Sequence, residues 1–204
     1  MRVNKKKFIY LISPNKIYKK FFKDLRTVLE TKKIYFFQLR LKKYSLKDKI
    51  LIGRKIKSIC KKNKVKFLIN DDPLLAIKLG ADGYHLGQND MSIIDARKIL
   101  KKKIIGVTCH NSINLAKIAN KNNADYIAFG AFNTTKTKKV KYKADIKIIK
   151  EFKKTSRIPV VVIGGINNLN YKKLLLNKAD FLAISGYVWN NKKLKPLEAI
   201  KLLK

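Results

Sequence analysis

Two aspartates follow apolar runs of the chain and could share a metal ion. Asp71 closes the run Phe67-Leu-Ile-Asn-Asp71, and Asp90 lies just past the next run, in Gly87-Gln-Asn-Asp90. If these runs are neighbouring parallel strands, about 4.8 Å apart, both carboxylates reach one point above the strand ends. Two carboxylates suit Mg2+, which prefers oxygen ligands and takes the rest from phosphate and water. The alternative is that Asp90 caps the next helix, and taken alone these residues favour neither interpretation.

A second group of polar residues carries positive charge. Gln38, Arg40 and Lys42 alternate at the end of an apolar run, so they share one face of a strand. The planar fork of arginine and the point charge of lysine both suit phosphate. An ordinary lysine-rich surface explains Lys43 and Lys47 better than it explains Arg40. This strand end is therefore a candidate anion site.

Two further segments could bind a second phosphate. The run Asn133-Thr-Thr-Lys-Thr-Lys138 offers three hydroxyls and two ammonium groups, although loops rich in Thr and Lys are common. Gly164-Gly165 lets the backbone approach an anion closely, and Ile184-Ser185-Gly186 ends a later apolar run. A tight turn is the alternative interpretation of the glycine pair.

The histidines and cysteines give weaker indications. A lone histidine is more often a satisfied structural residue than a catalyst, and we apply this to His110 and to His85, which lies inside an apolar run. Cys109 has no obvious base partner and is expected to be inert packing. Cys60 and Cys109 form neither a metal-ligand spacing nor a disulfide framework, which suits a reducing cytosol.

Eight short apolar runs, each followed by a helix-length stretch, would position these residues. The runs begin near residues 8, 35, 66, 83, 104, 126, 160 and 181. Near-continuous apolar strands are typical of a parallel sheet buried on both faces. Eight of them alternating with helices predict an α/β fold, a single (β/α)8 TIM barrel over residues 1–204. The polar residues then gather at the carboxyl ends of the strands, where such barrels place their active sites.

The predicted barrel also indicates a role for the two glycine-bearing segments. They end the seventh and eighth strands, and many (β/α)8 enzymes bind phosphate in the loops after those strands. Matching positions on both strands favour phosphate binding over a turn alone. The expected helices span about residues 16–32, 45–63, 73–80, 91–101, 112–123, 144–156, 168–178 and 196–203. Their expected caps are Ser45, Ser92, Asn111 and either Asn167 or Asn168.

The composition raises the question of nucleic-acid binding. The net charge is +36, yet only six of the 49 basic residues are arginine, and the lysines are spread over every expected helix. Residues that recognise base edges favour arginine and cluster on one element. We therefore interpret the lysine excess mainly as solvated helix faces.

The amino-terminal residues bear on the cellular location. Lysines at positions 5–7 precede only five apolar residues, Phe8 to Ile12, which is too short for a signal-peptide core. No stretch is long enough to span a bilayer. We expect a cytoplasmic protein.

With these residues in hand, the chain closely resembles the thiamine-phosphate synthase family over nearly its whole length. The ordered set of motifs and its spacing are specific, although each motif alone is modest. The motifs are Tyr10-Leu-Ile-Ser-Pro14, Gln38-Leu-Arg-Leu-Lys42, Ile69-Asn-Asp71, Gly80-Ala-Asp-Gly-Tyr-His-Leu-Gly-Gln-Asn-Asp90, Gly106-Val-Thr108, Thr135-Lys-Thr-Lys138, Gly164-Gly-Ile166 and Ile184-Ser185.

The resemblance implies an enzyme that joins 4-amino-2-methyl-5-(diphosphooxymethyl)pyrimidine to thiazole phosphate, releasing pyrophosphate with Mg2+ as cofactor. It implies a dissociative mechanism, in which pyrophosphate leaves before the thiazole nitrogen captures a pyrimidine-methyl cation. Carried over by position, the pyrimidine diphosphate contacts are Gln38, Leu39, Arg40, Leu41, Lys42, Asn70, Thr108 and Lys138. Of these, the expected catalytic residues are Arg40, Lys42, Thr108 and Lys138. The Mg2+ ligands are Asp71 and Asp90, and the thiazole phosphate contacts are Thr135, Lys136, Thr137, Gly165, Ile184 and Ser185.

The chain departs from the family pattern at a few positions. Ala131 and Thr134 stand where the family usually has proline, so this loop is expected to be less rigid. Thr108 stands where serine is frequent and keeps the hydroxyl. Neither departure removes a required functional group.

Two alternatives remain. A TenI-like thiazole tautomerase of the same superfamily has a similar barrel and would use His110 as the proton-transfer base. The complete set of diphosphate residues in this chain favours the synthase. The other alternative is a basic nucleic-acid-binding barrel, which salt-dependent binding to duplex DNA would support. We expect small phosphorylated substrates as partners, no specific nucleic acid and no membrane, and the resemblance leaves a homo-oligomer open.

Overall fold

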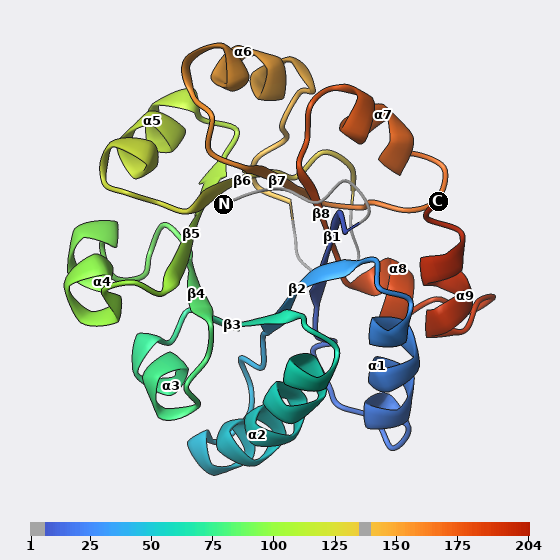
Figure 1. Ribbon diagram of the computed structural model, residues 1–204. Coiled ribbons are helices and arrows are strands. Elements are labelled where there is room, and N and C mark those ends of the chain that lie inside the picture. The colour runs from blue at the N-terminus through green and yellow to red at the C-terminus, as the bar shows by residue number, and fades with distance from the viewer. Residues whose placement is uncertain (1–6, 135–139) are drawn as a thin grey trace.

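The computed structural model describes residues 7–134 and 140–204 and forms a closed barrel of eight parallel strands (Figure 1). Each strand pairs with the next along the chain, and the last pairs with the first. The strands are β1 (Ile9–Ile12), β2 (Ile34–Leu39), β3 (Lys66–Asn70), β4 (Gly83–Leu86), β5 (Ile104–His110), β6 (Tyr126–Gly130), β7 (Val160–Ile163) and β8 (Phe181–Ile184). The predicted (β/α)8 barrel is confirmed, and no strand begins more than one residue from its expected position.

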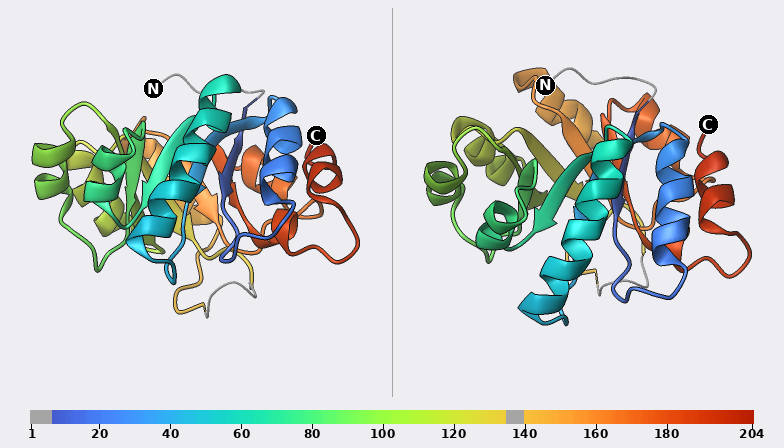
Figure 2. Two further views of the ribbon diagram at one scale, coloured as in Figure 1. Left: turned by 90° about the horizontal axis from the view of Figure 1, so that it is seen from below. Right: turned by 60° about the horizontal axis from the view of Figure 1, so that its bottom comes forward.

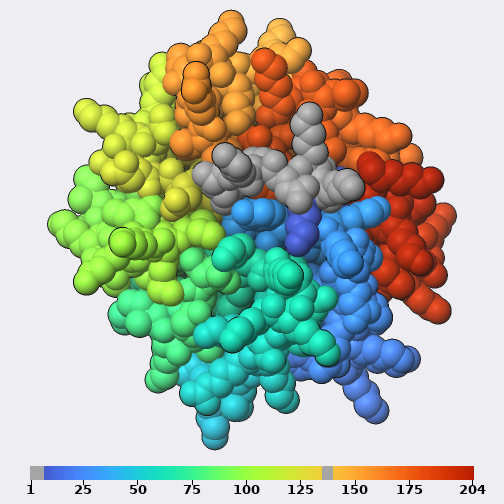
Figure 3. All heavy atoms as spheres, viewed as in Figure 1, coloured from blue at the N-terminus to red at the C-terminus, as the bar shows by residue number. Residues whose placement is uncertain are grey.

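The helices form an outer ring whose side chains make a continuous layer around the barrel (Figure 3). They are α1 (Phe21–Glu30), α2 (Leu46–Lys62), α3 (Pro73–Lys78), α4 (Ile93–Leu100), α5 (Ile113–Lys121), α6 (Lys147–Thr155), α7 (Tyr171–Leu176), α8 (Gly186–Trp189) and α9 (Pro196–Lys201). The short α8 was not among the expected helices. Within the described residues, no helix is both long and apolar enough to cross a membrane.

The expected helix caps are correct at two positions. Ser45 and Ser92 cap α2 and α4 through their hydroxyl oxygens. The expectation for Asn111 is wrong, because Ser112 caps α5 while the Asn111 amide donates to the Lys143 carbonyl. The expectation at residues 167 and 168 is also wrong, since α7 begins after Asn170.

Aromatic side chains fill the barrel interior. Tyr10, Phe36, Tyr126 and Phe181 come from four different strands and are at most 1% exposed. The ring centroid of Phe36 lies 5.2–5.5 Å from those of the other three. Because this interior is solid, a ligand can reach the strands only at their ends. Figure 2 shows the segments after β1 and β6 projecting from the same end of the barrel.

Three aspartates tie strands together at the opposite, amino-terminal end of the barrel. Each stands just before an even-numbered strand, accepts a backbone hydrogen bond from the preceding strand, and pairs with a cation. The hydrogen bonds come from Phe67 to Asp82 (2.9 Å), from Ile105 to Asp125 (2.8 Å) and from Val160 to Asp180 (2.7 Å), and the cations are Lys66, Arg97 and Lys153. These contacts stabilise the fold at a distance from the strand ends that carry the predicted site.

Replacing one of these aspartates should lower stability without changing the site. We expect Asp180→Ala to reduce the free energy of unfolding by about 2 kcal/mol, because hydrogen bonds to charged groups contribute about 1.5–3 kcal/mol. For a chain of this size the melting temperature should fall by roughly 4–8 °C, measured by calorimetry. The exposed Asp95 provides the control, since Asp95→Ala should change the melting temperature much less. Equal shifts in both variants would contradict the assigned role of Asp180.

Candidate active site

The structure brings Asp71 and Asp90 together at the ends of β3 and β4. The Asp71 N–H donates to the carbonyl of His85 on β4 (3.1 Å). Asp90 Oδ2 accepts a hydrogen bond from the Gly87 N–H (2.6 Å), so its carboxylate turns back toward the strand end. Since Ser92 caps α4, the interpretation of Asp90 as the helix cap is wrong.

Gly87 leaves the space that the two carboxylates share. A Cβ atom added there would lie 2.9 Å from Asp90 Oδ2 and 3.9 Å from Asp71 Oδ1. Burial raises the pKa of Asp71, but hydrogen bonds to Lys42 and Asp90 outweigh this effect and hold it below its ordinary value. Burial raises the pKa of Asp90 above its ordinary value, the Gly87 N–H opposes the rise, and the charge of Asp71 adds to it. The two carboxyl groups thus lie close enough to shift each other's pKa.

The basic residues of the β2 end surround this centre. Lys42 Nζ lies 2.8 Å from Asp71 Oδ2, and the Lys42 side chain is 59% exposed. Arg40 Nη1 donates to Asn15 Oδ1 after β1 (3.2 Å). Leu39 and Leu41 turn the other way and are buried in the core between barrel and helices. Leu39 and Leu41 are buried while Arg40 and Lys42 are more exposed, but β2 ends at Leu39, so Arg40 and Lys42 lie just beyond the strand and do not share a strand face with Gln38.

A hydrogen-bonded chain crosses the top of the barrel interior, and sequence reasoning missed most of it. Gln38 Nε2 donates to the Tyr10 hydroxyl (2.8 Å), which bonds the Tyr126 hydroxyl (2.8 Å). Tyr126 bonds His85 Nδ1 (2.9 Å), and His85 Nε2 bonds Thr108 Oγ1 (2.8 Å). The overlooked signal is a tyrosine inside a buried strand, because a buried phenol needs a hydrogen-bond partner.

The His85 imidazole takes part in these hydrogen bonds in its neutral form. Burial lowers the pKa of His85 to about 4, the Asp71 carboxylate opposes the fall, and the positive charge of Arg40 adds to it. Both ring nitrogens have partners, so the prediction of a satisfied histidine is confirmed. Asn70 is the last residue of β3 and pairs in register with His85, which places it beside Asp71.

The ends of β7 and β8 form a second part of the site. Gly164 and Gly165 have positive φ angles of 110° and 57°, a backbone that other residues rarely adopt. The Ser185 hydroxyl donates to the Ser13 carbonyl after β1 (3.1 Å). The Ile184 side chain is buried, so only its backbone could contact a ligand. Thr135, Lys136, Thr137 and Lys138 lie outside the described residues.

His110 stands at the base of the segment that follows β6. Its φ is 50°, and its ring stacks on Tyr142 with centroids 4.3 Å apart. The Ala131 N–H donates to the Tyr142 carbonyl (2.9 Å), which joins the two ends of that segment. Cys109 is buried, and burial raises the pKa of its thiol to about 12, so it is the inert residue that we expected.

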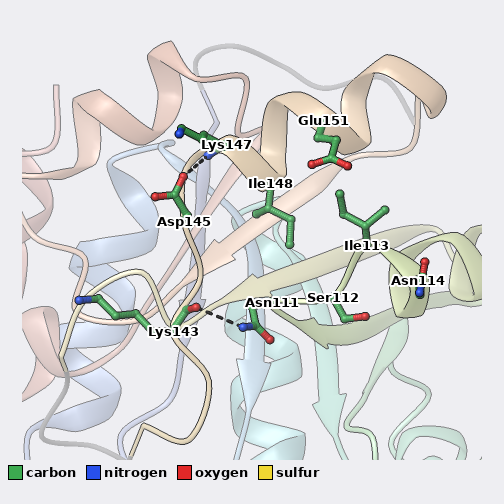
Figure 4. A pocket seen from close by; sticks show the side chains of 9 residues that line it. All are labelled: Asn111, Ser112, Ile113, Asn114, Lys143, Asp145, Lys147, Ile148 and Glu151. Atoms are coloured by element: carbon green, nitrogen blue, oxygen red, sulfur yellow. Dashed lines mark hydrogen bonds between the residues drawn. The ribbon is translucent and has the colours of Figure 1, made fainter.

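Two clefts lie near these strand ends. The larger, about 570 Å³, lies between α5 and α6 and contains none of the predicted site residues (Figure 4). The smaller, about 450 Å³, is lined by Lys42, Asn70 and Asp71 together with Leu39 and Leu41. The smaller cleft therefore adjoins the candidate site residues at the ends of β2 and β3.

Comparisons with known proteins show which family the chain resembles. A family model described as thiamine monophosphate synthase matches residues 9–188. The chain is 68% identical to a thiamine-phosphate synthase of Pelagibacter ubique, with 100% of both chains covered. It is 39% identical to a thiamine-phosphate synthase of Erythrobacter litoralis, covering 89% of this chain and 88% of that protein. The structure of a thiamine phosphate pyrophosphorylase from Pyrococcus furiosus superposes with a TM-score of 0.86 at 27% identity, covering 97% and 94%.

Proposed function

The chain belongs to the thiamine monophosphate synthase family and is an enzyme of that kind, and we propose that it joins an aminopyrimidine methyl diphosphate to thiazole phosphate with Mg2+. The products are thiamine phosphate and pyrophosphate. The observation that carries the proposal is the meeting of Arg40, Lys42 and the Asp71–Asp90 pair at adjacent strand ends. Cations beside a carboxylate pair suit a diphosphate that binds together with a divalent metal.

We assign Mg2+ to Asp71 and Asp90. The space above Gly87 that a Cβ atom would fill supports this assignment. Within residues 7–134 and 140–204 no group of three or more His, Cys, Asp or Glu side chains could hold a metal ion. A two-carboxylate donor set suits Mg2+, which takes its other ligands from phosphates and water. When bound, the metal would supply positive charge to the leaving diphosphate.

The side chains of this protein would bind the diphosphate and stabilise it as it leaves. Lys42 can exchange Asp71 for a phosphate at little cost, because an exposed ion pair contributes only about 0–1 kcal/mol. Arg40, Lys42 and Lys138 would face the diphosphate oxygens, and the Thr108 hydroxyl would add a hydrogen bond. Asn70, Gln38 and the backbone of Leu39 and Leu41 would complete the contacts to the pyrimidine diphosphate.

The coupling needs no side-chain nucleophile. The bond between the pyrimidine methylene carbon and the diphosphate oxygen breaks, and its electron pair leaves with pyrophosphate. The thiazole nitrogen then donates its lone pair to that carbon and forms the new carbon–nitrogen bond. The contribution of the protein is therefore positioning and electrostatic stabilisation.

We place the thiazole phosphate at the ends of β7 and β8. The left-handed backbone at Gly165 and the hydroxyl of Ser185 support this placement, together with the frequent use of this position for phosphate in such barrels. The backbone of Ile184 and the segment Thr135, Lys136 and Thr137 would provide the remaining contacts.

Mixing the purified protein with both phosphorylated precursors and Mg2+ tests the proposal. We expect thiamine phosphate and pyrophosphate to form in equal amounts. Isomerisation of the thiazole without coupling would instead support the tautomerase alternative. Salt-dependent binding to random duplex DNA without either reaction would support the nucleic-acid-binding alternative.

A further inference from the structure

The chain of hydrogen bonds from Gln38 to Thr108 has a direction that follows from counting protons. Tyr10 and Tyr126 are at most 1% exposed, so each phenolic proton must find an acceptor within the protein. Each hydroxyl carries one proton, and a neutral histidine carries one proton on its two ring nitrogens. Once the first bond is oriented, all the others are oriented too.

The Gln38 amide sets the direction. Its Nε2 group can only donate, so the Tyr10 oxygen accepts and the Tyr10 proton points to Tyr126. Tyr126 then has His85 Nδ1 as its acceptor, which requires Nδ1 to carry no proton. The His85 proton therefore sits on Nε2 and is donated to Thr108 Oγ1.

We propose that this chain makes the Thr108 hydroxyl a hydrogen-bond donor toward the ligand at the barrel mouth, with Tyr10, Tyr126 and His85 as positioning residues. Thr108 Oγ1 accepts from His85, so its own proton is left to point elsewhere. Thr108 is half-buried near the end of β5, between the buried residues Val107 and Cys109. An anion would accept this proton, and its identity as the diphosphate rests on the proposed function.

Packing of the aromatic rings holds the hydrogen-bonded side chains in one arrangement. The rings of His85 and Tyr126 stack with centroids 5.7 Å apart and an interplanar angle of 16°. Tyr10 meets Tyr126 edge-to-face at 5.7 Å. The five residues come from β2, β1, β6, β4 and β5, so the closed barrel itself sets their separations. Moving the hydroxyl of Tyr10 or Tyr126, or turning the His85 ring, would break two hydrogen bonds at once.

Nitrogen NMR of His85 tests the direction without any substrate. The protein has two histidines, and the signals that disappear from the spectrum of a His110→Ala variant belong to His110. We expect the wild-type protein to show a protonated Nε2 and an unprotonated Nδ1 on His85. In Tyr126→Phe, where Nδ1 loses its donor, we expect part or all of the proton to move to Nδ1. A proton on Nδ1 in the wild-type protein would mean that every hydrogen bond from Tyr10 to Thr108 points the opposite way, and this would overturn the proposal.

Calorimetric titration with inorganic pyrophosphate and Mg2+ tests the consequence at Thr108. We expect Thr108→Val to weaken binding by roughly 10–100-fold, as for loss of a hydrogen bond to a charged group, and Thr108→Ser to restore most of it. Tyr126→Phe should weaken binding less, and it should add nothing in the Thr108→Val background. Additive losses in the double variant would show that Tyr126 does not act through Thr108, and would overturn the proposal.

Tyr171→Phe is a matched control for the tyrosine variants. Its hydroxyl also makes two hydrogen bonds, with the backbone of Lys204, and lies on α7. We expect it to lower stability while leaving the His85 tautomer and pyrophosphate binding unchanged. A wild-type protein that binds no pyrophosphate would contradict the proposed function, and the tautomer measurement would still decide the direction of the chain.

Discussion

Asp71→Asn should reduce the rate of thiamine phosphate formation by about 10²–10³-fold or more, because a positioned electrostatic group commonly contributes that much. The substitution removes a charge that faces both Asp90 and Lys42. It therefore weakens the proposed metal site and leaves Lys42 without its carboxylate. Steady-state rates at saturating Mg2+, with circular dichroism as a check on folding, measure the effect.

The neighbouring aspartate provides the control. Asp72 caps α3 by accepting from the Leu75 N–H, and asparagine caps helices equally well. Asp72→Asn should therefore keep nearly wild-type activity and stability. A chelator should abolish turnover of the wild-type protein, and added Mg2+ should restore it. Turnover that survives both the chelator and Asp71→Asn would reject the metal assignment.

Lys138→Ala should also cut coupling by about 10²–10³-fold, since a positioned cation on the leaving group stabilises the charge that develops there. Lys138 lies outside the described residues, so this prediction rests on its place in the Thr135-Lys-Thr-Lys138 motif. The measurement is steady-state formation of thiamine phosphate by the variant and the wild-type protein.

His110→Ala separates the synthase from the tautomerase. A dissociative coupling has no proton transfer for His110 to perform, and its ring stacks on Tyr142 at the base of the segment after β6. We expect a far smaller loss than for Lys138→Ala. An inactive His110 variant beside a nearly normal Lys138 variant would lead us to abandon the coupling mechanism in favour of proton-transfer chemistry.

Local patterns of the sequence were enough to predict the barrel. Runs such as Val160–Ile163 are apolar on both faces, and only a buried parallel strand requires this. Helix ends were less predictable. The expected helix at 16–32 begins only at Phe21, because the preceding residues make contacts with other parts of the fold, such as the Ile17 N–H with the Tyr44 hydroxyl.

For the described residues, the motifs also predicted which side chains lie near the strand ends, but not how they are oriented. Period two predicted one shared face for Gln38, Arg40 and Lys42, whereas β2 ends at Leu39 and the two basic residues follow it. The sequence does not show that Gln38 bonds Tyr10 inside the barrel while Lys42 reaches Asp71 outside it. The same alternation left open whether Asp90 caps α4, and the structure decided against it.

The sequence by itself determined the fold, the end of the barrel that carries the site, and the residue types available there, because these depend on local hydrophobic periodicity and on the order of strands. Only the tertiary structure decided the contacts across the barrel. Tyr10 and Tyr126 are 116 residues apart in the chain, and barrel closure brings their hydroxyls within 2.8 Å. Periodicity states which side of a strand faces inward, whereas closure determines which inward residues from different strands meet.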